Sequence, residues 1–102
     1  MSPVEELYHW FKKHQDLFSS NCSEIEFKDL GRGSANVFLD AGDFMISVSV
    51  WNNAICLDIE VLDVETDDCK FPHVGDCESF EEFRRHLGKF LTWFTGNVAK
   101  NA

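Results

Sequence analysis

Basic residues are scarce in this sequence. Its 102 residues include nine Lys and Arg against eighteen Asp and Glu, so the formal net charge is -9 and the pI is near 4.7. A chain with this balance has too few cations for an extended basic surface. We therefore expect neither nucleic acid nor an anionic membrane among its partners.

The sequence also lacks long apolar runs and a secretion signal. No window approaches the roughly 18 uninterrupted apolar residues of a membrane helix. The segment Met1-Ser2-Pro3-Val4-Glu5-Glu6 has neither the basic patch nor the apolar stretch of a signal peptide. We expect a cytoplasmic protein whose four cysteines are reduced thiols.

The common catalytic and phosphate-binding motifs are absent as well. The chain has no Gly-x-Ser-x-Gly, no His-Glu-x-x-His and no phosphate loop. Cys69, His73 and Cys77 could supply three zinc ligands from one loop, but their spacing is not that of a zinc ribbon and a fourth ligand is missing. We expect no catalytic residue, no metal and no cofactor.

Apolar residues are plentiful. They make up 44% of the chain, and ten of the residues are Phe, which is enough bulk for one core. The length corresponds to a single domain over residues 1–102, and we predict an ordered core over about 3–95 with a frayed C-terminal tail.

Periodicity then predicts the elements. A capping box from Ser2 to Glu5 begins a helix that ends near residues 19–21, and a second one at Ser79 begins another. Alternating residues predict strands over 23–29, 35–40, 44–51 and 54–64, with Asn52-Asn53 as a two-residue hairpin loop. The predicted fold is α+β: a two-layer domain with an N-terminal helix, a four-stranded antiparallel meander and a C-terminal helix, both helices on one sheet face.

The negative charge is concentrated in one stretch. Residues 58–82 hold ten acids and one base, whereas the rest of the chain has eight of each. Two interpretations remain open: a solvated edge that discourages aggregation, and a face that binds a basic partner. Trp51, Phe38 and Met45 fall on the outer side of their predicted strands, so a small apolar patch flanks the acids.

A resemblance adds to this reading. The stretch from Ser49 to Thr66, sharpest in Val50-Trp51 and in the pattern Asp-x-Glu-Val-x-Asp-x-Glu-Thr from Asp58, resembles the TriTu family of bacterial immunity proteins. A Ser-x-Glu-Glu helix start follows it at Ser79. Cys69, His73 and Cys77 lie in a loop without a recognisable family pattern.

The resemblance implies an antidote. Members of the family inhibit secreted Rhs or type VI antibacterial toxins whose ADP-ribosyltransferase domain uses NAD to modify the translation factor EF-Tu. The expected partner is therefore a cognate toxin domain with a basic NAD cleft, bound by a monomer in a 1:1 heterodimer. The candidate contact residues are Trp51, Asn52, Asn53, Asp58, Glu60, Asp63 and Glu65.

Two other functions compete with this hypothesis. A small acidic secretion chaperone of the type III kind, which holds a segment of an effector, has a similar size and charge. An enzyme or metal protein is the third possibility, based on the carboxylates and the loop with Cys69 and His73.

Overall fold

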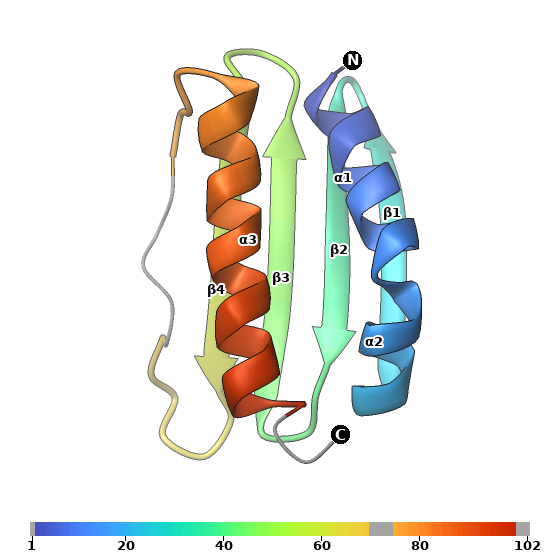
Figure 1. Ribbon diagram of the computed structural model, residues 1–102, viewed down its shortest axis with the longest axis vertical. Coiled ribbons are helices and arrows are strands. Elements are labelled where there is room, and N and C mark those ends of the chain that lie inside the picture. The colour runs from blue at the N-terminus through green and yellow to red at the C-terminus, as the bar shows by residue number, and fades with distance from the viewer. Residues whose placement is uncertain (1, 70–74, 100–102) are drawn as a thin grey trace.

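The computed structural model describes residues 2–69 and 75–99. Within these residues the chain forms, in order, α1 (Pro3–Lys13), α2 (Gln15–Asn21), β1 (Glu24–Gly31), β2 (Ser34–Asp40), β3 (Phe44–Trp51), β4 (Cys56–Asp63) and α3 (Phe80–Asn97). The strands make an antiparallel sheet in the order β1-β2-β3-β4. Figure 1 shows α1 and α2 over β1 and β2, and α3 over β3 and β4, on the same side of the sheet. The predicted α+β fold is confirmed.

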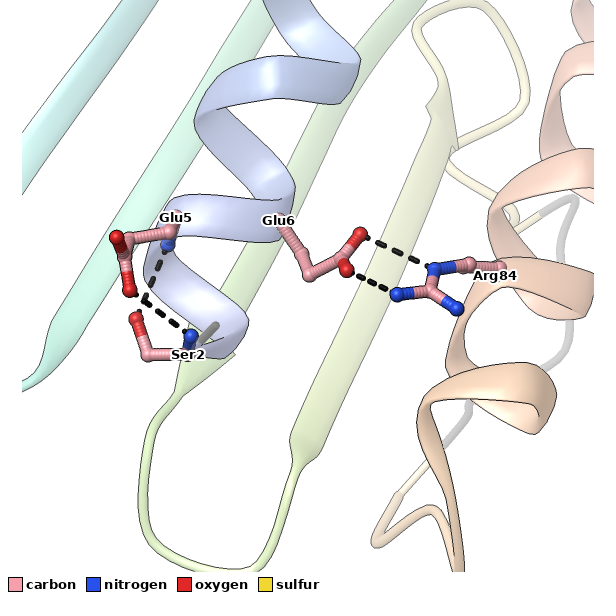
Figure 2. A network of polar contacts seen from close by, with 4 residues as sticks. All are labelled: Ser2, Glu5, Glu6 and Arg84. Atoms are coloured by element: carbon pink, nitrogen blue, oxygen red, sulfur yellow. Dashed lines mark hydrogen bonds and ion pairs between the residues drawn. The ribbon is translucent and has the colours of Figure 1, made fainter.

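The first helix starts where its capping box predicts. The Ser2 hydroxyl accepts a hydrogen bond from the Glu5 backbone N–H at 3.2 Å, and the Ser2 N–H donates to the Glu5 carboxylate at 3.0 Å (Figure 2). The bond from the Ser2 backbone N–H lowers the pKa of the Glu5 carboxyl group. The box thus satisfies backbone donors that a helix start leaves unpaired.

One predicted helix is two in the structure. The break is at His14, whose φ of -108° and ψ of 13° are not helical and whose N–H donates to the Trp10 carbonyl at 3.2 Å. Phe11 and Phe18 stack across the break with ring centroids 6.2 Å apart. The bend keeps both rings against the core, and no Pro or Gly marks it in the sequence.

The core lies between the helices and the inner face of the sheet. Every second residue of β2, β3 and β4 is buried there, as the alternation predicts, except Phe44 and Asp63 at the strand ends, which are half-buried. The helices contribute seven fully or almost fully buried Leu and Phe side chains to it: Leu7, Phe11 and Phe18 from α1 and α2, and Phe83, Leu87, Phe90 and Phe94 from α3. Each such ring or Leu stabilises the fold by about 1.5–3 kcal/mol relative to an exposed one.

The turn between β3 and β4 is longer than predicted. Trp51 pairs with Cys56, so four residues rather than two connect the strands. The positive φ angles fall on Ala54, at 77°, and Ile55, at 45°, and not on the two asparagines.

Asn52 instead makes hydrogen bonds to two other parts of the fold. Its backbone N–H donates to the Gly33 carbonyl at 2.8 Å, and its side-chain oxygen accepts the Val4 N–H at 3.1 Å. The residue therefore ties the β3–β4 turn to both the β1–β2 turn and the start of α1.

The described parts of the connection after β4, residues 64–69 and 75–79, meet the edge of that strand at two points. Single bridges join Leu62 to Cys69 and Cys56 to Asp76. Helix α3 then starts at a Ser79 cap, whose hydroxyl accepts the Glu82 N–H at 3.1 Å. The predicted His73 lies outside the described residues.

Candidate interaction surface

The helices leave the outer face of the sheet uncovered. Cross-strand pairing aligns its side chains in rows, such as Lys28, Asn36, Ser49 and Asp58 from β1 to β4. We call the following set the outer face: Glu24, Glu26, Lys28, Asn36, Phe38, Asp40, Met45, Ser47, Ser49, Trp51, Cys56, Asp58, Glu60 and Leu62.

Hydrogen bonds hold the centre of the outer face. The Asn36 amide donates to the Ser47 hydroxyl at 2.7 Å and to the Ser49 hydroxyl at 2.9 Å. These bonds join β2 to β3 through side chains as well as through the backbone. The surface is therefore a rigid one, suited to binding without a large loss of conformational entropy.

Beside these residues the outer face is hollowed. A pocket of about 220 Å³ is lined by Phe38, Met45 and Leu62, with Ser47 and Glu60 at the same place. Met45 and Leu62 remain 37% and 39% exposed, so the apolar lining of this pocket is open to solvent. An apolar hollow with a carboxylate beside it fits a side chain that has an apolar stem and a cationic head.

Acidic side chains flank the outer face on both sides. Asp58 and Glu60 belong to β4, and Glu24 and Glu26 belong to β1 at the opposite edge. Lys28 is the single base of this face, and it lies 3.6 Å from Glu26. Sequence counting assigned the charge imbalance to residues 58–82 alone, and strand pairing adds the β1 acids to the same surface.

The structure brings some of the predicted contact residues together. Trp51, Asp58 and Glu60 all belong to the outer face, and Trp51 is 38% exposed. Asn53 is exposed in the turn that follows. Asn52, in the same turn, uses its side chain to hold α1.

The other two candidates, Asp63 and Glu65, are not part of the outer face, and Glu65 is exposed in the turn after β4. Asp63 is at the far end of β4 with the parity of the inner face, and its carboxylate accepts the N–H groups of Glu65 and Thr66 at 3.0 and 3.1 Å. It is five residues from Asp58, or about 17 Å along a strand. Leu62, and not Asp63, has the outer-face parity that Asp58 and Glu60 share. The period of two along β4 is the sequence signal that could have identified Leu62.

The sulfur atoms of the possible zinc loop are separated. Cys69 bridges to Leu62 and Asp76 to Cys56, so Cys69 and Cys77 flank opposite ends of β4. Six residues of strand span about 20 Å, too far for one ion. Burial, and then Asp76, raise the pKa of the Cys56 thiol on the outer face.

A second hollow lies in the helical layer. A groove of about 380 Å³ runs between α1 and α3, where Glu6 and Arg84 reach across from the two helices to form an ion pair (Figure 2). Its lining also includes Trp10, Lys13 and His14. Burial, followed by the nearby Lys13 charge, lowers the pKa of His14. The charges of the groove are mixed and partly paired, whereas those of the outer face are nearly all of one sign.

None of the helices in residues 2–69 and 75–99 is long and apolar enough to cross a membrane. No curated protein and no solved structure matches the chain. The family model described as "Immunity protein TriTu" matches residues 5–93, which include the whole sheet, α2 and most of α1 and α3. The chain therefore belongs to the TriTu family of immunity proteins.

Proposed function

We propose that this immunity protein binds the ADP-ribosyltransferase domain of a cognate Rhs-type toxin and covers its NAD cleft with the outer face. The observation that carries the proposal is the uncovered sheet face, where the Glu60 carboxylate lies beside an apolar hollow and further acids lie on β1 and β4. A cleft that holds the pyrophosphate of NAD presents cationic groups, and a rigid acidic sheet is complementary to them. Inhibition then needs no chemistry from the immunity protein, only occupation of the cleft.

The hollow supplies the specific contact in this proposal. A lysine or arginine of the toxin would place its aliphatic stem against Phe38, Met45 and Leu62 and its charge beside Glu60. Trp51, at the end of the same face, is the aromatic anchor. Asp58 and Glu60 bind further basic groups, and Asn53 contacts the toxin from the turn.

The size of the face agrees with a 1:1 complex of monomers. Four strands at about 4.8 Å spacing and eight residues at about 3.3 Å per residue give a surface of about 19 by 26 Å. A specific interface needs about 800 Å² of accessible surface from each partner. These dimensions correspond to about 500 Å², so the flanking turns of the same copy have to supply the remainder.

Co-expression with the toxin domain tests the proposal. The variant Asp58→Lys/Glu60→Lys should fail to protect cells, and its dissociation constant, measured by calorimetry, should rise about a hundredfold or more, because it places two cations where the toxin presents cations. The matched control Asp16→Lys/Glu81→Lys makes the same change in net charge on the helical layer and should protect like the wild type.

Two results would contradict different parts of the proposal. If the wild-type chain gives no protection against the toxin, the assigned toxin class is wrong. If the β4 double variant keeps its wild-type melting temperature and still protects fully, the toxin binds another surface.

The family assignment favours this function over a secretion chaperone. A chaperone of that kind binds an unfolded segment, commonly as a dimer, whereas the proposed partner is a folded domain. Light scattering of the purified chain, followed by titration with the folded toxin domain, separates the two: the immunity function requires a monomer that binds the folded domain.

A further inference from the structure

A second group of side chains with binding chemistry lies away from the outer face, where the chain enters α3. The thiol of Cys77, a carboxylate oxygen of Glu82 and an imidazole nitrogen of His86 all lie within 4.8 Å of one another. Cys77 is 6% exposed, and the other two are half-buried. Sulfur, oxygen and nitrogen atoms thus converge from two different segments.

The backbone around this group is well fixed. The Cys77 N–H donates to the Ile55 carbonyl at 3.1 Å, which holds the segment against the start of β4. Glu82 and His86 are four residues apart in α3, so their side chains project from the same side of the helix. One Glu82 oxygen accepts the Glu78 N–H at 3.2 Å, which orients the carboxylate.

The contact between Glu82 and His86 is too long for a hydrogen bond, and the Cys77 thiol is directed to a backbone carbonyl. The second Glu82 oxygen lies 3.7 Å from Nε2 of His86, and the Cys77 thiol donates to the Gly75 carbonyl over 3.8 Å. A zinc ion, with bonds of about 2.0–2.3 Å to such ligands, needs them about 3.3–3.8 Å apart. Small side-chain rotations would bring the three atoms to that spacing.

The donor set identifies the class of ion. Mg²⁺ and Ca²⁺ take oxygen ligands, whereas a set with one thiolate and one imidazole matches Zn²⁺. The acids Asp76, Glu78 and Glu81 lie beside the group in the sequence and add to the negative potential that attracts a cation.

We propose that Cys77, Glu82 and His86 bind one Zn²⁺ ion, with water as the fourth ligand. On binding, the thiol proton passes to solvent and the sulfur bonds to the metal. The ion joins the segment before α3 to the first two turns of that helix, and so stabilises the packing of α3 beside β4. This link between the two segments does not depend on the identity of the toxin.

Cobalt substitution tests the site. The tag-free, full-length chain is stripped with a chelator, kept reduced, and titrated with Co²⁺ under anaerobic conditions. One equivalent should produce a near-ultraviolet thiolate-to-cobalt band and visible bands of four-coordinate intensity, and Zn²⁺ should displace it one for one. Cys77→Ser should lose the near-ultraviolet band, and His86→Gln should weaken binding about tenfold or more.

The controls are Cys69→Ser and His9→Gln, which change an exposed thiol and an exposed imidazole and should titrate like the wild type. Zinc at one fixed concentration should raise the melting temperature of the wild type and of both controls clearly more than that of His86→Gln, a readout that remains useful if Cys77→Ser folds poorly. The proposal is wrong if cobalt gives no thiolate band, or if the band survives Cys77→Ser in folded protein.

Discussion

At the residue scale, the backbone conformation determines whether an added side chain raises or lowers the free energy of unfolding. Gly88 lies in the interior of α3, and a Cβ built there meets no atom within 4 Å. Gly42, in the turn between β2 and β3, also has open space around it, but its φ is +82°. The two glycines therefore differ only in conformation.

Substitution by alanine should separate them. Gly88→Ala should raise the free energy of unfolding by about 0.5–1 kcal/mol, because alanine loses less backbone entropy in a helix. Gly42→Ala should lower it by about 1 kcal/mol or more, because a side chain is strained at that φ. Urea unfolding of the two variants measures both values, and a destabilising Gly88→Ala would show that a side chain does meet an obstacle in the groove.

At the element scale, most of the fold could be predicted from the sequence. The bounds of β3, Phe44–Trp51, agree with the prediction, and so do the inward and outward sides of β4. These features follow from a period of two, which a single strand shows without its neighbours. The capping box at Ser2 is equally local.

The features that sequence analysis missed depend on partners distant in the chain. The break at His14 has no Pro or Gly, and it is set by how Phe11 and Phe18 pack in the completed core. Glu24 and Glu26 join the acidic face through strand pairing, which composition cannot show. The candidate site was therefore predicted at Trp51 and along β4 but not at β1.

The turn between β3 and β4 shows the same limit and gives a prediction. Ala54 has a φ of 77°, which costs an alanine about 1–2 kcal/mol relative to its usual backbone conformation. Ala54→Gly should therefore stabilise the protein, by up to about 1 kcal/mol after the added backbone entropy of glycine is subtracted. Ala35→Gly, in the buried part of β2, should destabilise it.

Thermal melts of these two variants test the turn geometry. A stabilisation of about 1 kcal/mol corresponds to a rise of about 4–8 °C in a domain of this size. A fall in melting temperature for Ala54→Gly would mean that the turn in solution does not require a positive φ at this position.

At the scale of the whole molecule, the net negative charge lies on the sheet side and not on the helical layer. The three helices carry five acids and five bases, so the negative excess belongs to the sheet and its connections. The acids of the helices are Glu5, Glu6, Asp16, Glu81 and Glu82, and their bases are Lys12, Lys13, Arg84, Arg85 and Lys89. Such a molecule should approach a basic partner with its sheet side facing that partner.

This polarity predicts how salt affects association with the toxin domain. Between low salt and about 0.5 M salt, the association rate constant should fall about tenfold or more, while the dissociation rate constant changes less, because screening acts mainly on the approach. Stopped-flow measurement at several salt concentrations gives both constants. The variant Asp16→Lys/Glu81→Lys should retain a steeper salt dependence than Asp58→Lys/Glu60→Lys, and equal slopes would mean that only net charge matters.

The position of α3 also governs when the fold can form. All neighbouring strands of the sheet are consecutive in the chain, so the meander can begin to pair while the chain is still being synthesised. Phe83, Phe90 and Phe94 reach the core only with α3, which is the last of the described elements to leave the ribosome (Figure 1). Until then the inner face of β3 and β4 is bare. The complete core that supports the sheet therefore forms only after α3 has emerged and packed against β3 and β4.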